Sequence, residues 1–239
     1  MNIPKKILVA TDFNDLATAA LRVAAGIAQR TGGSLTLLYA DTFEPPAEFT
    51  SPQLLRVAKA IESSRRRAKD ELESCAKEHV PPGVPHLNVV IDALPVHAIS
   101  SYADKHDFDL IAMGTHGRGG VQRILLGSVA EQVTHHTSVP VLTVHDPSRV
   151  RSIQRIAATS GAREYAVALA PVLAATVTIV EKEDLDTIDG ANYDLIVADP
   201  ALRNLRKIVR HAHVPVLTLP PGDKRLTAAS RENAHELQR

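Results

Sequence analysis

The sequence predicts a doubly wound, Rossmann-like α/β fold, in which a five-stranded parallel sheet is covered by helices on both faces. Short apolar runs alternate with segments of helical periodicity along residues 1–147. Each run is almost wholly apolar, which is typical of parallel strands that are buried on both sides. A second, truncated α/β copy is predicted after residue 147, because two of the apolar runs recur there in the same order.

The first strand, turn and helix are predicted between Lys5 and Gly33. Lys5–Ala10 (KKILVA) is a short β-rich run, and residues 11–15 are turn-like. Apolar residues then recur at steps of three and four, as one buried face of a helix requires, and the pair Gly32-Gly33 supplies a left-handed helix end. The apolar residues of that face are Leu16, Ala19, Ala20, Val23, Ala24 and Ile27.

The remaining elements of the first part follow from the same patterns. A long helix ends at Pro81-Pro82-Gly83, with the run Arg65-Arg66-Arg67 on its solvated face. Pro95 opens a short helix, since proline is favoured in a first helical turn. The other predicted strands are Ser34–Ala40, His86–Ile91, Phe108–Gly114 and Val139–Val144, and the last helix is Ser128–His136. The apolar face of the long helix consists of Leu54, Ala58, Ile61, Ala68, Leu72 and Cys75.

An internal repeat divides the chain. The segment 193–197 (YDLIV) echoes 108–112 (FDLIA), and 214–219 (VPVLTL) echoes 139–144 (VPVLTV). We therefore expect a complete domain at 1–147, a degenerate copy at 148–222 and a polar tail at 223–239, which is disordered or forms a short exposed helix. The copy lacks the long middle helix, the third strand and the glycine-rich segment of the first part.

Composition excludes several classes of function. Lys and Arg number 27, as do Asp and Glu, so a formal net charge of zero does not attract nucleic acid or an anionic membrane. Cys75 is the single cysteine and forms no intrachain disulfide, which indicates a reducing compartment. The N-terminus has no signal-peptide pattern, and no apolar run approaches membrane-spanning length, so we expect a cytoplasmic protein.

The segment 113–128 (MGTHGRGGVQRILLGS) carries the chemistry. Gly114, Gly117 and Gly127-Ser128 give the spacing G-x2-G-x9-G-S between a predicted strand and a predicted helix. Glycines there let backbone N–H groups approach a phosphate, and the start of the next helix adds partial positive charge. Ser128 can serve as both helix N-cap and phosphate ligand. A tight turn alone would explain any single glycine, but the full spacing favours an anion site.

These residues resemble the universal stress protein family, whose ATP-binding members carry G-x2-G-x9-G-[ST]. The resemblance runs from KKILVATDF through MGTHGRGGVQRILLGSVAEQV to VPVLTV, about residues 3–146. It implies the fold named above, a stress-response or regulatory role, and ATP, ADP or AMP as ligand, with or without Mg²⁺. One departure is Ala93, where many members have glycine.

The resemblance also assigns roles to individual residues. Asp12 would contact the ribose, Ala40 would meet adenine through its backbone, and Met113 would lie beside the nucleoside. Gly114 and Gly117 would lie near ribose and phosphate, and Gly127, Ser128 and Val129 would receive the phosphates. The full set of expected nucleotide-binding residues is Ala10, Thr11, Asp12, Ala40, Met113, Gly114, His116, Gly117, Arg118, Gly127, Ser128 and Val129.

Some of these residues have a plainer interpretation. Asp12 could cap the helix that begins near Asp15, and Arg118 or His116 could be solvated loop residues. The pair His135-His136, with His145, suggests a metal site, but adjacent helical residues point in different directions and no carboxylate or Cys spacing supports one. We therefore expect no metal site, and histidines that complement the helix dipole.

Little in the sequence points to catalysis. It has no G-x4-G-K-[ST] lysine, no carboxylate pair placed for magnesium and water, and no nucleophile with a spaced base. Any ATP hydrolysis is expected to be slow. Because family members dimerise by pairing their last strands, the two VPVLT segments could pair within the chain as a pseudo-dimer, or between chains as a homodimer. The alternative function is a nucleotide-independent protein-interaction module of the same fold.

Overall fold

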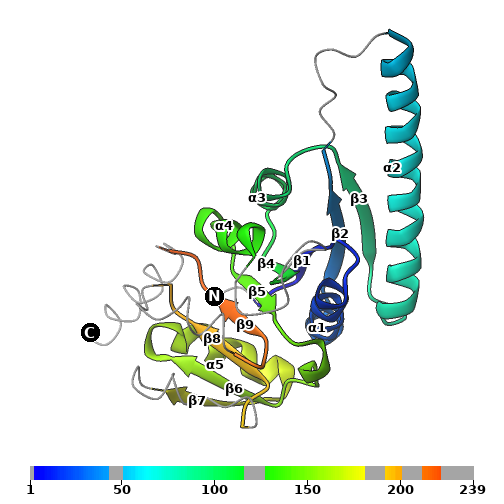
Figure 1. Cartoon of the computed structure of the whole chain (residues 1–239). Helices are drawn as coiled ribbons and strands as arrows, with labels where there is room; N and C mark the ends of the chain where they lie inside the picture. Colours follow the sequence, from blue (N-terminus) through cyan, green and yellow to red (C-terminus); the bar gives the residue numbers. More distant parts are fainter. Residues whose placement is uncertain (1–2, 43–50, 116–126, 181–191, 201–211, 222–239) are drawn as a thin grey trace.

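The computed structural model describes residues 3–42, 51–115, 127–180, 192–200 and 212–221, without the side chains of residues 51–54. Within these ranges the chain forms a single nine-stranded sheet with helices on both faces (Figure 1). The strands, in their order across the sheet, are β3 (His86–Ile91), β2 (Ser34–Ala40), β1 (Lys6–Ala10), β4 (Leu110–Gly114), β5 (Val141–Val144), β9 (Val216–Thr218), β8 (Leu195–Ala198), β6 (Arg155–Thr159) and β7 (Thr176–Val180).

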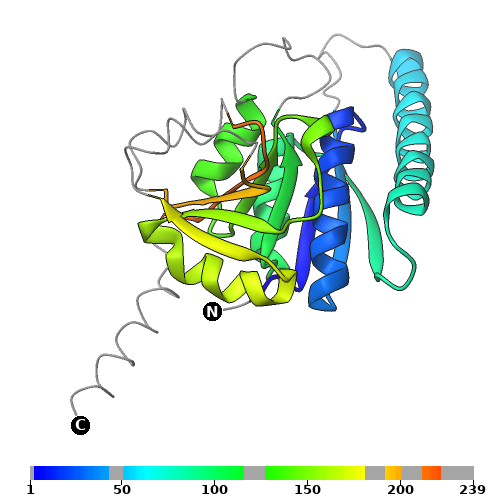
Figure 2. The same cartoon turned by 90° about the horizontal axis from the view of Figure 1, so that it is seen from below.

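The helices divide between the two faces of the sheet. One apolar cluster joins α1 (Asp15–Thr31), α2 (Ser51–His79) and α5 (Arg163–Leu173) to one face. A second cluster joins α3 (Pro95–Lys105) and α4 (Ser128–His136) to the other. Figure 2 shows α1 and α5 on the same side of the sheet. Two short 3₁₀ helices, η1 (Pro147–Arg149) and η2 (Ser160–Ala162), lie beside β5 and β6 in the chain.

The five-stranded parallel sheet expected for residues 1–147 is confirmed in the order β3-β2-β1-β4-β5, but it does not end there. Strand β5 pairs antiparallel with β9, with Val141 opposite Thr218 and Thr143 opposite Val216. The other seven pairs of neighbouring strands are parallel, so this is the single antiparallel seam among the described strands. The two VPVLT segments therefore pair within the chain, as one of the two expected arrangements, and β9 occupies the edge that a homodimer through β5 would need.

Helix α1 begins and ends where local chemistry dictates. The side chain of Asn14 accepts a hydrogen bond from Ala17 N at 2.8 Å and so satisfies one of the N–H groups exposed at a helix start. At the other end, Gly32 adopts φ 62° and Gly33 N donates to Ala28 O at 2.9 Å. The left-handed end predicted from Gly32-Gly33 is confirmed, since this φ is readily adopted by glycine.

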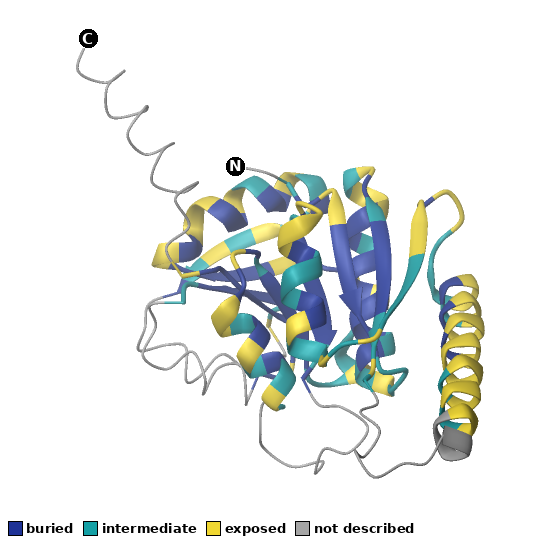
Figure 3. Ribbon diagram, turned by 90° about the horizontal axis from the view of Figure 1, so that it is seen from above, coloured by how far each residue is buried: buried dark blue, intermediate teal, exposed yellow. Residues whose placement is uncertain are grey.

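Helix α2 departs from the expectation of one continuous buried face. Ala68 and Leu72 are buried against the sheet, whereas Ile61 and Cys75 are only partly buried and Ala58 is exposed. The side chain of Leu54 lies outside the described residues. The N-terminal part of α2 extends beyond the ends of β2 and β3 (Figure 1), and its sides are mostly exposed (Figure 3). The apolar pattern correctly predicts a helix, but the sheet is too short to cover the first turns of α2.

The same hydrogen-bonded corner precedes β4 and β8. The Asp109 carboxylate accepts bonds from Lys5 N at 3.1 Å and Lys6 N at 3.0 Å, and the Asp194 carboxylate accepts bonds from Gln154 N at 3.1 Å and Arg155 N at 2.9 Å. Each carboxylate thus fixes the start of the neighbouring strand, β1 or β6. Local structure at the two YDL/FDL echoes is therefore repeated in detail.

The two halves of the chain share one packed interior. Ile7 of β1 and Leu217 of β9 belong to the same buried cluster. Arg30, at the end of α1, donates hydrogen bonds to the carbonyl of Leu173 and, at 3.2 Å, to Ser152 Oγ. The second half is therefore bound to the first through both the sheet and the helical layer.

Candidate nucleotide site

A cavity of about 430 Å³ opens at the carboxyl ends of β1, β2 and β4. In this sheet the chain moves from β1 to β2 on one side, and later to β4 on the other, so the cavity lies at the point where strand order reverses. Ligands of doubly wound folds bind at such a point, in cavities of this size. The residues that line it are Ala10, Thr11, Asp12, Leu38, Ala40, Pro95, Ile99, Met113, Gly114, Thr115, Gly127, Ser128, Val129 and Ala130.

The exit of β1 places a carboxylate at the cavity wall. Thr11 N donates to Leu38 O at 2.9 Å, and Phe13 N donates to Thr11 Oγ1 at 3.0 Å, where Phe13 turns at φ 67°. Asp12 Oδ1 accepts from Asn14 N at 3.3 Å. Because Asn14 itself caps α1 at Ala17, the helix-cap interpretation of Asp12 is wrong. Asp12 holds the cap residue and faces the cavity.

The end of β2 directs backbone groups toward the cavity. Hydrogen-bonding direction alternates along a strand, so residues two apart face the same neighbour. Thr11 N bonds to Leu38 O on the β1 side, whereas Asp41 N bonds to Ile91 O on the β3 side. The N–H and C=O groups of Ala40 therefore point toward the β1 side. Strand β1 has already ended at this height of the sheet, so these groups face the cavity instead of another strand.

Gly114 is a packing glycine. A Cβ atom at this position would lie 2.8 Å from Leu16 Cβ and 3.0 Å from Ala17 N, at the first turn of α1. Contacts this short are not tolerated by ordinary side chains. The glycine thus permits α1 to approach the end of β4, and Gly114 also lines the cavity.

Helix α4 presents its N-terminus to the same cavity. Gly127 is the N-cap residue, because its carbonyl accepts the first helical bond, from Glu131 N at 3.0 Å, and Gly127 N donates to Thr115 O at 2.6 Å. Ser128 is therefore the first helical residue and does not serve as the N-cap. Helical geometry leaves the N–H groups of Ser128, Val129 and Ala130 without intrahelical acceptors, and all three residues line the cavity.

Nine of the twelve expected site residues line this one cavity. The other three, His116, Gly117 and Arg118, lie outside the described residues. Five further lining residues are not predicted by the sequence motifs: Leu38, Pro95, Ile99, Thr115 and Ala130. Leu38 and Ala130 each lie within two residues of a predicted one, but Pro95 and Ile99 come from α3, which no motif connects with the glycine-rich segment.

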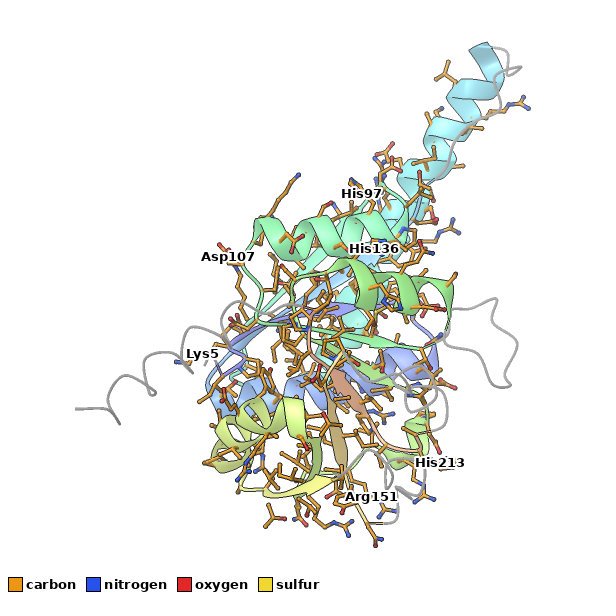
Figure 4. The ribbon with its side chains drawn as sticks, turned by 90° about the vertical axis from the view of Figure 1, so that its left-hand side faces the viewer. Lys5, His97, Asp107, His136, Arg151 and His213 are labelled. Carbon is orange, nitrogen blue, oxygen red and sulfur yellow. The ribbon has the colours of Figure 1, made fainter. Side chains whose placement is uncertain are left out.

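His135 and His136 lie at the end of α4, and His145 directly follows β5. His136 Nδ1 lies 2.7 Å from the carbonyl of Gln132, to which it donates within α4 itself, and Figure 4 shows His97 on the neighbouring helix α3. Over the ranges that the structure describes, no group of three or more His, Cys, Asp or Glu side chains could hold a metal ion. In the same ranges no helix is long and apolar enough to cross a membrane.

The comparison with protein families decides the assignment. Residues 4–145 match the model of the universal stress protein family. The chain belongs to the universal stress protein family. The matched range contains every strand and helix that lines the cavity, and it ends just after β5.

Individual relatives agree. The chain is 33% identical over 152 residues to the universal stress protein MJ0531 of Methanocaldococcus jannaschii, covering 62% of this chain and 86% of the relative. Protein MJ0577 of the same organism is 31% identical, and its solved structure superimposes with a TM-score of 0.51 over 60% of this chain and 96% of that one. A universal stress protein structure from Archaeoglobus fulgidus covers 92% of this chain and 99% of its own, with a TM-score of 0.65 and 17% identity. The last likeness shows that the fold, including the second half, has a solved counterpart.

Proposed function

We propose that this universal stress protein binds an adenine nucleotide in the cavity between β1, β2, β4 and α4, and that it acts in a stress response or in regulation. The observation that carries the proposal is the combination within one cavity of an apolar end, a carboxylate and the exposed first turn of a helix. Adenine nucleotides are bound by members of this family. The three parts of the cavity correspond to the three parts of such a ligand.

The apolar end suits a purine base. Leu38, Ile99 and Pro95 supply hydrophobic surface, and the peptide groups of Ala40 supply hydrogen-bond partners at its edge. Apolar walls with a few placed polar groups are what small-molecule sites use to orient a ligand. Asp12, the charged residue among the described lining residues, would accept hydrogen bonds from ribose hydroxyls.

The start of α4 suits phosphates. The N–H groups of Ser128, Val129 and Ala130 have no helical acceptors, and the helix dipole adds partial positive charge at the same end. Gly127 N is already bonded to Thr115 O, so we assign it no phosphate. The proposed phosphate ligands are therefore the three amides that follow Gly127 and the hydroxyl of Ser128.

Binding without efficient hydrolysis fits the described lining. Asp12 is a lone carboxylate there, and a water would need a base beside the terminal phosphate. Mg²⁺ enters the proposal as a counter-ion carried by the nucleotide's phosphates. We expect slow turnover at most.

A matched pair of variants tests the site. Asp12→Asn removes the charge at the ribose position but keeps an oxygen that can accept from Asn14, whereas Asp15→Asn makes the same change on the exposed first turn of α1, outside the cavity lining. A hydrogen bond to a charged group contributes about 1.5–3 kcal/mol, so Asp12→Asn should weaken ATP and AMP binding about 10- to 100-fold in calorimetry. Asp15→Asn should bind as the wild type does. Equal affinity of all three proteins would refute the ribose assignment.

The alternative, an interaction module without nucleotide, predicts a different result for the wild type. The chain has no Trp and four Tyr, so bound adenine would shift its absorbance maximum toward 260 nm. Purified protein with an unshifted spectrum, and no heat on titration with ATP or AMP, would support the interaction module and refute the nucleotide proposal.

We further propose that residues 148–222 are a truncated second domain of the same type. The corners at Asp109 and Asp194 support this, and so does the strand order β5-β4-β1-β2, which is repeated as β9-β8-β6-β7. Circular dichroism and thermal unfolding of a chain ending at residue 147 would test independence: a folded, cooperative fragment supports two domains, and an unfolded one opposes the division at 147.

A further inference from the structure

Thr115 connects the end of β5 with the start of α4. Its side chain is 1% exposed, and both its N–H group and its hydroxyl donate to the carbonyl of Val144, at 3.1 Å and 3.2 Å. Two donors on one carbonyl restrain the residue in position and in orientation, since a single bond would leave the peptide group free to pivot. Thr115 is thus held to the last residue of β5.

The carbonyl of Thr115 then fixes the helix start. It accepts the N–H of Gly127 at 2.6 Å, and the carbonyl of Gly127 accepts the N–H of Glu131 at 3.0 Å. This series of hydrogen bonds runs from β5 to the first turn of α4 through Thr115. The three amides proposed to bind phosphate follow Gly127 directly.

The position of β5 is in turn set by the second half of the chain. Thr143, the neighbour of Val144, is 1% exposed and lies opposite Val216 in the antiparallel seam, and its hydroxyl donates to Val216 O at 3.3 Å. Strand β9 therefore holds the residue adjacent to the carbonyl on which Thr115 depends. Strand β9 thus acts on the cavity indirectly: it holds Thr143, and the neighbouring Val144 bonds to the lining residue Thr115.

We propose that Thr115 is a positioning residue for the phosphate end of the ligand, and that the second half contributes to nucleotide affinity through β5 and Thr115. This inference rests on the proposed nucleotide site. It predicts that loss of the Thr115 hydroxyl weakens contacts to phosphate and leaves contacts to the nucleoside unchanged. A purely structural role would instead weaken all ligands alike or none.

The test compares ATP with adenosine by calorimetry. Thr115→Val removes the hydroxyl and keeps the shape, and Thr115→Ser restores the hydroxyl. The matched control is Thr159→Val, because the Thr159 side chain is 2% exposed and its hydroxyl accepts a backbone bond from Asp199 N at 3.0 Å in the second half. Thr115→Val should bind ATP about five- to tenfold more weakly, as the loss of one hydrogen bond predicts, with adenosine affinity within about twofold of the wild type. Thr115→Ser and Thr159→Val should retain the wild-type ratio of ATP to adenosine affinity.

The outcomes separate the two proposals. If the wild type binds neither ligand, the nucleotide site itself is refuted. If the wild type binds ATP and the ratio is unchanged in Thr115→Val, the positioning role is refuted while the site stands. A ratio that falls equally in Thr159→Val would assign the effect to general loss of stability and would also overturn the inference.

Discussion

Two glycine-to-alanine substitutions that both concern α1 should change stability in opposite directions. At Gly114, the added methyl group would meet backbone and Cβ atoms of the first turn of α1, at 2.8–3.0 Å from Leu16 and Ala17. At Gly26, in the middle of α1, an added Cβ would meet nothing within 4 Å. The same chemical change is therefore a steric collision at one site and a gain in helix propensity at the other.

The magnitudes follow from these surroundings. Backbone atoms cannot rotate away as a flexible side chain can, so Gly114→Ala should lower the free energy of unfolding by about 1–3 kcal/mol, as overpacking of a core does. Gly26→Ala should raise it by about 0.4–1 kcal/mol, since alanine restricts the unfolded chain and favours the helix. For a chain of this size each kcal/mol corresponds to about 2–4 °C in melting temperature.

Urea unfolding followed by circular dichroism measures both values, with the wild type as reference. The slope of the transition should be the same in all three proteins, so that the midpoints compare directly. Gly114→Ala should also weaken ATP binding, because relief of the collision moves α1 away from the cavity wall. A Gly114→Ala protein as stable as the wild type would refute the packing role of Gly114.

Two further predictions concern titrating groups. Burial alone would raise the pKa of Asp194, but hydrogen bonds from the Arg155 side chain and from two backbone N–H groups outweigh burial and lower this pKa below its usual value. A carboxyl group with a lowered pKa stabilises the fold at pH values above its unfolded-state pKa, about 3.9, and that stabilisation is lost as pH falls through the folded-state pKa. The difference in free energy of unfolding between wild type and Asp194→Asn, measured with urea, should therefore shrink below about pH 4. A difference that stays constant with pH would contradict this. Burial, followed by the charges of Glu78 and Glu71, raises the pKa of the half-buried Cys75 thiol. At pH 7 a disulfide reagent should therefore modify the native thiol more slowly than the thiol of the urea-unfolded chain, and a faster reaction of the native protein would contradict this.

Periodicity and local capping predicted the elements of the first half because those features depend on neighbours in the chain. The run SLTLLYA gave β2 with its observed bounds, and Gly32 gave the end of α1. The apolar run predicts the start of β4 two residues too early, at Phe108, because the Asp109 carboxylate bonds to the start of β1 before Leu110 enters the sheet. That corner depends on a residue more than 100 positions away, which no local pattern contains.

The candidate site was predicted where a motif describes it and missed where tertiary packing builds it. The glycine spacing located the cavity, but it did not show what each glycine does. Gly114 leaves room for α1, and the N–H group of Gly127 is bonded to the carbonyl of Thr115. Pro95 and Ile99 reach the cavity because α3 packs beside α4. Apolar residues at a helix start are common in any sequence, so their role emerges only from the docking of the two helices.

The second half retains the parts that lay β9 against β5. The Asp194 corner aligns β8 with β6, β8 holds β9 in parallel register, and β9 covers an uncharged strand that would otherwise be an exposed sheet edge. No counterpart of β3 extends beyond β7 in the described sheet. A counterpart of β3 would add to the far edge of the sheet and would not reach the β5–β9 seam. Among the described strands, the second half thus keeps those near the β5–β9 seam and lacks the strand farthest from it. This is the pattern expected if the second half serves to support β5 and, through Thr115, the proposed phosphate end of the site.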